Sequence, residues 1–267
     1  MNKETLKKIF LPLIVLVLII QVWIGVAAVV EDFPTPSSTY TAAFGGVNAD
    51  GDDIEGSLAD PFYIENQDDK GVFWQIMASL QRVFGGFALA IIVGVPVGLF
   101  IGMSKNAQYA LDPFIQIFKP VSPLAWLPLL LFIFKDINAT AISTIFITSI
   151  WPIIINTALG VRSVNEDYMN VAKVLRFTAF EKVMQIILPV AVPFIFTGMR
   201  LSLGIAWLVI VAAEMLTGGI GIGFWIWDEY NNLNYENIII GIILVGFVGF
   251  LLDLVMGKIA DYFDYTK

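Results

Sequence analysis

The stretch that decides the fold runs from residue 163 to residue 189 and reads SVNEDYMNVAKVLRFTAFEKVMQIILP. It is rich in charged and polar residues, although it lies between two of the most apolar stretches of the chain. It holds two helix-start signatures, Ser163 with Glu166 and Thr178 with Glu181. In each, a glutamate lies three residues after a hydroxyl and can reach back to it. The segment therefore predicts two short helices that break near Thr178.

Apolar residues recur at helical spacing within the same segment, so each short helix is expected to carry an apolar face. A solvated loop has no use for such a face. The residues that form it are Val171, Val174, Leu175, Phe180, Val183, Met184 and Ile187.

The composition places the whole chain in a membrane. Of 267 residues, 58% are hydrophobic and only 14% are charged, with a mean hydropathy of +0.80, which is not typical of a water-soluble domain. A helix needs roughly 20 apolar residues to cross the hydrocarbon core. Six apolar runs are read as spans, although the third is short: 9–30, 83–103, 121–134, 139–161, 186–213 and 238–256. The sequence predicts an all-α membrane protein with six transmembrane helices.

The distribution of Lys and Arg predicts the orientation. Six spans place both termini on one side, and eleven Lys or Arg residues fall on that side, against three on the other. Both termini and the segment 162–187 are therefore expected in the cytoplasm. The first span has a longer apolar core than a signal peptide, so it is read as a retained anchor.

These spans give a domain reading in four parts. Residues 1–30 form an N-terminal transmembrane helix, and residues 31–75 form an acidic periplasmic loop. Residues 76–262 form the main transmembrane domain, and residues 263–267 form a cytoplasmic tail. The interval 31–70 carries ten acidic residues and one lysine, which supplies the acidic balance of the chain.

Several chemistries are excluded or disfavoured by what the chain lacks. It has no Cys and no His, which removes disulfides, thiol chemistry, histidine metal ligands and histidine bases. No catalytic pair or Walker motif occurs, so neither an enzyme nor self-contained ATP use is expected. The GGIGIG stretch at 218–223 lacks the Lys-Ser/Thr of a phosphate-binding loop and is read as an outer turn.

Two intramembrane patterns are candidates for packing and transport. Gly94, Gly98 and Gly102 recur at every fourth position, which lets two helix backbones approach closely, within the chain or between chains. Arg200, Trp207 and Glu214 are seven residues apart and share one helix face. An ionisable residue in a membrane is costly unless it faces protein or water, so this face is expected to line a pathway. Alternatively, Arg200 and Glu214 lie near opposite ends of the span and snorkel to the membrane surfaces.

The segment 170–189, NVAKVLRFTAFEKVMQIILP, resembles the cytoplasmic coupling loop of ABC importer permeases, whose pattern is Glu-Ala-Ala, a Gly, and Ile-x-Leu-Pro. Asn170 occupies the acid position, Val171 and Ala172 the alanine positions, and Arg176 the Gly position. The final Ile-x-Leu-Pro matches at residues 186–189. The stretches PVSPLAWLPLLLF at 120–132 and VAAEMLTGGIGIGFWIWDEYN at 211–231 are similar to the nitrate, sulfonate and bicarbonate group of these permeases, and most of all to those for nitrate and nitrite.

The resemblance implies a type I ABC importer permease fold with a cytoplasmic coupling helix. It implies a homodimeric, multi-pass permease in the bacterial inner membrane that imports a small inorganic anion by alternating access. The partners would be cytoplasmic ATPase subunits, which bind ATP and Mg, and a periplasmic or lipid-anchored binding protein. This chain would bind no cofactor, metal or nucleic acid. Contact with the ATPase is expected around Asn170, Ala172, Arg176, Phe177, Thr178, Ala179, Phe180 and Glu181.

The cargo is expected to be nitrate or nitrite, with bicarbonate, taurine, an alkanesulfonate or cyanate as alternatives on the same machinery. An anion pathway needs N–H donors, which Arg200, Trp207, Trp151 and Asn156 can supply. Glu214 fits an anion route poorly and is expected to pair with a cation or to belong to an outer gate. An ion-coupled carrier or channel without an ATPase is the reading from a different class.

Overall fold

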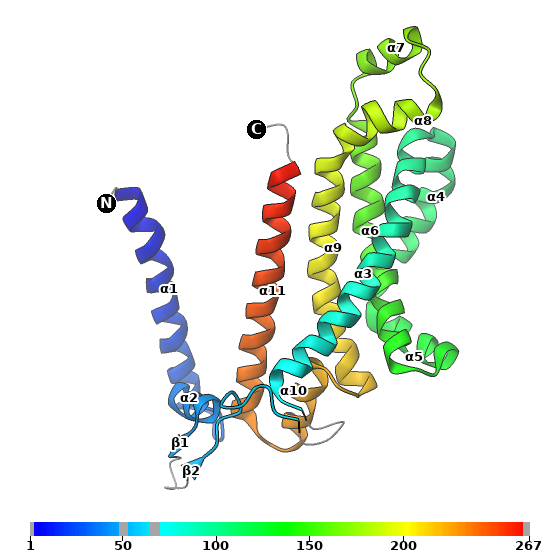
Figure 1. Cartoon of the computed structure of the whole chain (residues 1–267). Coiled ribbons are helices and arrows are strands. Elements are labelled where there is room, and N and C mark those ends of the chain that lie inside the picture. Colours follow the sequence, from blue (N-terminus) through cyan, green and yellow to red (C-terminus); the bar gives the residue numbers. More distant parts are fainter. Residues whose placement is uncertain (1–2, 48–52, 65–69, 264–267) are drawn as a thin grey trace. The chain divides into compact units, whose positions relative to one another are not determined.

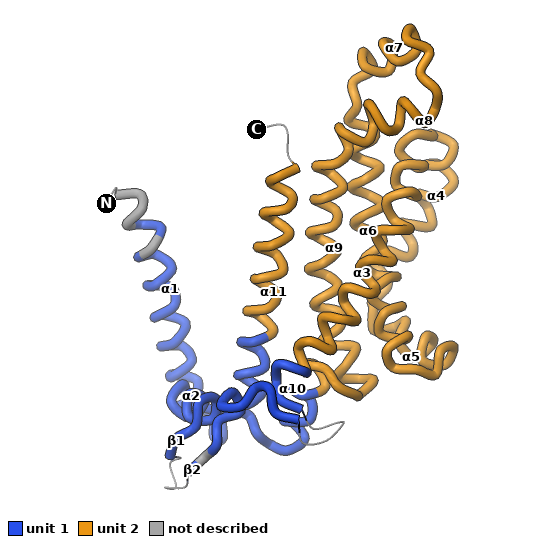
Figure 2. Tube along the Cα trace, viewed as in Figure 1, with its two compact units in different colours: residues 1–74, 225–244 blue, residues 75–224, 245–267 orange. Residues whose placement is uncertain are grey.

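The computed structural model describes residues 3–47, 53–64 and 70–263 of the chain (Figure 1). The acidic positions at 48–52 and 65–69 and the tail residues 264–267, to which the sequence reading assigned roles, lie outside the described residues. Two compact units are distinguished: residues 1–74 with 225–244, and residues 75–224 with 245–267 (Figure 2).

Helices dominate the described residues. In chain order the elements are α1 Lys3–Ala27, α2 Pro36–Phe44, β1 Gly46–Val47, β2 Asp53–Ile54, α3 Val72–Met103, α4 Lys105–Phe118, α5 Pro123–Phe134, α6 Ile137–Arg162, α7 Glu166–Val174, α8 Ala179–Lys182, a π-helical turn Val183–Ile187, α9 Leu188–Thr217, α10 Ile222–Asn231 and α11 Tyr235–Phe263.

Five of these stretches are long and apolar enough to cross a membrane: Phe10–Ala27, Val72–Met103, Ile137–Arg162, Ala179–Thr217 and Tyr235–Phe263. The predicted run at 121–134 forms α5, which is only 12 residues long. The preceding helix α4 was not predicted, and it makes an angle of 95° with α5. The number of spans reaches six when this bent pair counts as one.

In the larger unit, α6 packs against α3 and α9. It carries a stripe of buried threonines. The Asp136 side chain caps its first turn by accepting a hydrogen bond from Ala139 N at 2.7 Å. Thr140, Thr144 and Thr148 are buried, and each hydroxyl donates to the carbonyl four residues earlier at 2.7–2.9 Å. Because each O–H donor finds a partner within the helix, the threonines can face the bundle.

Glycines and alanines allow α3, α6 and α9 to pack closely. A Cβ added to Gly98 on α3 would lie 2.6 Å from Thr157 Cβ on α6, and one added to Gly102 would lie 2.5 Å from Val161 Cβ. One added to Gly94 would lie 3.0 Å from Ile153 on α6. On the other side of α6, Gly160 packs against Ala191 of α9 in the same way. The three predicted glycines therefore all face α6 of their own chain.

The smaller unit contains α1, α2 and the short strand pair β1–β2. The strands are antiparallel, with Gly46 opposite Ile54 and Val47 opposite Asp53. Trp23 Nε1 on α1 donates to Pro34 O at 2.8 Å, which ties the end of α1 to the start of α2. Thr35 and Ser38 form a capping box at the start of α2. The interval 31–75 thus contains ordered secondary structure.

Candidate functional site

The hairpin of residues 163–189 consists of α7, α8 and the π-helical turn that leads into α9 (Figure 1). The predicted break near Thr178 is confirmed, with a complete capping box: Thr178 N donates to Glu181 Oε2 at 2.7 Å, and Glu181 N donates to Thr178 Oγ1 at 3.3 Å. The signature at Ser163 was wrong. Ser163 ends α6 and donates to Gly160 O, whereas Asn165 caps α7 by accepting from Asp167 N at 2.9 Å.

Arg176 closes the turn between α7 and α8 in a left-handed conformation, with φ of +54°. Its N–H donates to Lys173 O at 3.1 Å, and Phe177 N–H donates to Ala172 O at 2.9 Å. These two bonds form a Schellman motif, in which the residue at the position of Arg176 is usually glycine. The Gly position of the family pattern is thus occupied by a residue that keeps the glycine-like backbone.

The hairpin exposes a set of large apolar side chains. Phe180 is 70% exposed and Val174 is 82% exposed, and Val171, Leu175 and Met184 are also exposed. Ala172 and Ile187 face inward and are buried. Clustered apolar exposure of this kind is a mark of a binding surface for another protein.

On the membrane-spanning part, Arg200 of α9 forms a two-pronged ion pair with Asp253 of α11. Arg200 Nε lies 2.7 Å from Asp253 Oδ1, and Nη2 lies 2.6 Å from Oδ2. The two side chains are 47% and 55% exposed within this chain. A half-exposed ion pair in a span requires water or another protein surface beside it.

Trp207 lies beside this pair in a groove between α9 and α11. Its indole N–H is already used, since it donates to Val245 O at 2.9 Å, and the residue is buried. The groove has a volume of about 270 Å³, and Gly204, Gly246 and Gly249 are among its lining residues. Arg200 and Trp207 are thus brought together by the structure.

Glu214 is not part of this groove, because its carboxylate faces α3. It is fully buried, with Arg82 Nη1 2.6 Å from Oε1 and Ser79 Oγ 2.8 Å from Oε2. Arg82 also donates to Asn138 Oδ1 at 2.8 Å and to Ile220 O at 2.6 Å. The pairing of Glu214 with a cation, which the sequence analysis expected, therefore occurs, and the partner is Arg82.

This buried network also holds the glycine-rich connection between α9 and α10. Gly221 N donates to Gln75 Oε1 at 2.7 Å, Ile222 N to Ser79 Oγ at 3.0 Å, and Gly223 N to Glu214 Oε2 at 3.1 Å. A Cβ at Gly221 would overlap the Glu214 carboxylate. Glycine is therefore required at position 221, because the backbone there approaches the Glu214 side chain closely. Residues 218–223 are called the clamped turn below, because these hydrogen bonds hold them.

The two remaining predicted donors lie on α6. Trp151 lines a second groove of about 270 Å³ with Pro120, Pro123 and Trp126. Asn156 is turned along its own helix and donates Nδ2 to Pro152 O at 2.8 Å. Neither residue lies in the groove of Arg200, and Asn156 does not line the groove of Trp151, so the five predicted pathway residues lie in four places.

Sequence reasoning missed the partners of both ion pairs. Arg82 was counted only as an outer-side charge, and Asp253 was not singled out. A signal was present for Asp253, because it is an acid inside the apolar run 238–256, where ionisable residues are costly. Arg82 lies just before an apolar run and gives no comparable signal.

Among the described residues, no group of three or more Asp and Glu side chains is placed to hold a metal ion.

The family model for the binding-protein-dependent transport system inner membrane component matches residues 94–265, most of the membrane-spanning part. The chain belongs to this permease family.

Curated relatives of this permease are similar over most of its length. The nitrate import permease of Leptolyngbya laminosa is 52% identical over 204 residues, which cover 76% of this chain and 73% of that protein. The bicarbonate transport system permease of Synechococcus elongatus is 47% identical over 72% of this chain and 70% of that protein. These relatives are transport permeases, not enzymes.

The fold of this permease is also that of solved ABC importers. The inward-facing MetNI methionine transporter matches with a TM-score of 0.60 over 72% of this chain and 95% of that one, at 15% identity. The expected type I importer permease fold is therefore confirmed, and the protein is a multi-pass inner-membrane component.

Proposed function

We propose that this permease is the membrane subunit of an ATP-driven importer for nitrate or nitrite. The observation that carries the proposal is the 52% identity to a nitrate import permease. Bicarbonate is the second candidate cargo, because a bicarbonate permease is almost as similar. A taurine permease of Escherichia coli is more distant, at 34% identity.

In this proposal the partner ATPase changes conformation as it binds and hydrolyses ATP, and the hairpin of residues 163–189 transmits that movement to the membrane-spanning helices. Its exposed apolar side chains, Phe180 above all, support docking on a partner ATPase that binds ATP and Mg²⁺. The contact centres on Asn170 and the 176–181 turn. Ala172 packs inside the hairpin and positions the turn, since it is buried. The π-helical turn at Val183–Ile187 joins the hairpin to α9, so movement of the hairpin would reach a spanning helix directly.

The topology follows from the hairpin, because an ATPase partner places residues 163–189 and both termini in the cytoplasm. The 31–75 region, α10 and the clamped turn then lie on the outer side, where a substrate-binding protein delivers the anion. A second copy of the chain completes the membrane unit and supplies cover for the half-exposed Arg200–Asp253 pair.

The anion pathway is assigned to the groove between α9 and α11. Two of the five N–H groups of Arg200 bond to Asp253, so the guanidinium retains donors that can face an anion. Trp151 and Asn156 remain candidate donors farther along α6. Glu214 supports the outer turn and does not contact the anion, because it is fully buried beside Arg82.

The test is ATP hydrolysis by the nanodisc-held complex, purified through this chain with its native partners and binding protein. Nitrate, nitrite, bicarbonate and taurine are added separately. Stimulation by nitrate or nitrite alone is the expected result. Stimulation by bicarbonate alone would show that the protein is an ATP-driven importer whose cargo is bicarbonate and not nitrate. Absence of any co-purified ATPase would favour a carrier or channel and overturn the proposal.

A further inference from the structure

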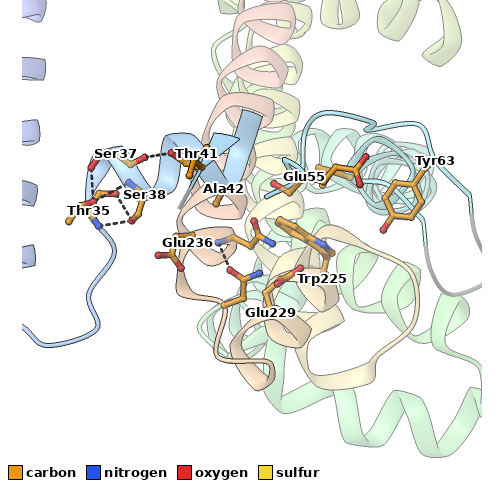
Figure 3. Close-up of a pocket in the computed structure, with 15 residues that line it drawn as sticks. Thr35, Ser37, Ser38, Thr41, Ala42, Glu55, Tyr63, Trp225, Glu229 and Glu236 are labelled. Atoms are coloured by element: carbon orange, nitrogen blue, oxygen red, sulfur yellow. Dashed lines mark hydrogen bonds between the residues drawn. The ribbon is translucent and has the colours of Figure 1, made fainter. Parts of the chain in front are cut away.

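The smaller unit contains a cavity of about 800 Å³ that the proposed transport function does not use (Figure 3). Its lining residues come from α2 and the residue before it, from β1, from residues 55, 57, 63 and 72, from α10, and from the start of α11 with the residue before it. A volume of this size is within the range of small-molecule sites, about 300–1,000 Å³, and exceeds what a single side chain would fill.

The lining is acidic and rich in acceptors. Glu55, Glu229 and Glu236 contribute three carboxylates, and no described lining residue is Lys or Arg (Figure 3). Burial raises the pKa of the Glu229 carboxyl above its usual value, and Asp228 adds to this, while hydrogen bonds from Asn237 and Asn234 oppose it. A carboxylate that has lost solvent in this way gains from a nearby positive charge.

An independent observation points to a ligand with hydrogen-bond donors. Asn237 lines the cavity and is only 9% exposed, and its Oδ1 accepts no hydrogen bond from any described residue. The Ser57 hydroxyl, also in the lining, is buried without a partner as well. A buried acceptor left unpaired destabilises the fold. A donor supplied from the cavity would remove that cost.

A metal ion does not fit these residues, because the described acids include no group of three placed around one ion. The carboxylates are spread over a wider space, as suits a larger cation with separated donors. Trp225 adds an aromatic ring to the same lining, and such rings attract ammonium and guanidinium groups.

We propose that this cavity binds a small organic cation of the diamine or guanidine class, with Glu229 and Asn237 as its principal contacts. Glu229 supplies the charge and Asn237 Oδ1 accepts an N–H from the ligand. The site is separate from the anion route, and it rests on the cavity alone and not on the nitrate assignment.

The experiment titrates the purified full-length chain in nanodiscs with agmatine, putrescine and spermidine, measured by calorimetry. 1,4-Butanediol serves as the uncharged probe. The variants are Glu229→Gln and Asn237→Leu, and the matched control is Glu31→Gln, which makes the same chemical change at an exposed acid of the same unit that does not line the cavity. Each lost charge-assisted bond is expected to weaken binding about tenfold or more.

Saturable binding of at least one cation, weakened in both site variants and unchanged in Glu31→Gln, supports the site. Failure of all three cations to bind the native chain overturns it, as does equal binding to every variant or equal binding of butanediol. Glu229→Gln preserves shape, so it decides the question if Asn237→Leu folds poorly. The two proposals can fail separately. If the chain binds a cation but its complex shows no nitrate-stimulated ATP hydrolysis, the cation site is supported and only the proposed cargo is wrong.

Discussion

Arg82 Nη1 on α3 and Glu214 Oε1 on α9 lie 2.6 Å apart, and this buried ion pair joins two residues that are 132 positions apart along the chain. Each partner makes further bonds, Arg82 to Asn138 and Ile220, and Glu214 to Ser79 and Gly223. The pair therefore organises the clamped turn as well as the two helices.

Removing one partner should be more harmful than removing both. Arg82→Met leaves a buried carboxylate without its cation, which costs about 3–5 kcal/mol, whereas Arg82→Met with Glu214→Leu removes both charges. We expect the single variant to melt at a lower temperature than the double variant. Recovery should be incomplete, because Gly223 N–H loses its acceptor. Lys105→Met, at an exposed position, is the control, and equal melting of the single and double variants would contradict this account.

The close approach of α3 to α6 gives a second prediction. Gly98→Ala places a methyl group 2.6 Å from Thr157 Cβ and 2.8 Å from Ile154 O, so the helices must separate. Overpacking of this kind costs about 1–3 kcal/mol. Gly25→Ala is the matched control, because nothing lies within 4 Å of its added Cβ. Thermal unfolding in detergent should show a lower melting temperature for Gly98→Ala only. Identical unfolding curves for both variants would contradict the proposed packing of Gly98 against α6.

The left-handed backbone at Arg176 predicts an unusual substitution pattern. Arg176→Gly relieves the strain of φ +54° and restores the residue that a Schellman motif prefers, so the hairpin should tolerate it. Arg176→Val places a β-branched residue there and should cost about 1–3 kcal/mol of local stability. Limited proteolysis of the hairpin distinguishes the two. Faster cleavage of the Gly variant than of the Val variant would contradict the assignment.

Two phenylalanines of the hairpin, Phe180, which is exposed, and Phe177, which is half-buried, predict where the ATPase docks. Phe177→Asp and Phe180→Asp place a charge in the proposed apolar contact, so the ATPase should dissociate or lose its coupling to transport. Phe62→Asp, also an exposed aromatic but outside the hairpin, is the control. Co-purification and anion-stimulated ATP hydrolysis report the two effects. Normal values in both hairpin variants would place the interface elsewhere.

Local and non-local features were predictable to different degrees. The capping box at Thr178 and Glu181 was readable because all its atoms come from four consecutive residues. The Arg82–Glu214 pair was not, since no local pattern says which helices pack together. The third span was misjudged in extent because α4 is amphipathic, and continuous apolarity does not reveal such a helix. Periodicity predicted that Arg200, Trp207 and Glu214 lie along one face of α9, but it did not predict that Arg200 and Trp207 share a groove while Glu214 is buried against α3.

The Arg200–Asp253 pair offers the sharpest test of the anion pathway. Arg200→Ala should abolish uptake while leaving the complex assembled, because the guanidinium is the proposed anion donor. The reversed pair, Arg200→Asp with Asp253→Arg, keeps the attraction between α9 and α11 but moves the positive charge to α11. If the pair only joins the helices, the reversed variant should regain uptake relative to Arg200→Ala. If Arg200 binds the anion, assembly should recover in the reversed variant and uptake should not. Isotope-labelled nitrate uptake into proteoliposomes, with assembly measured by co-purification of the ATPase, decides between these outcomes.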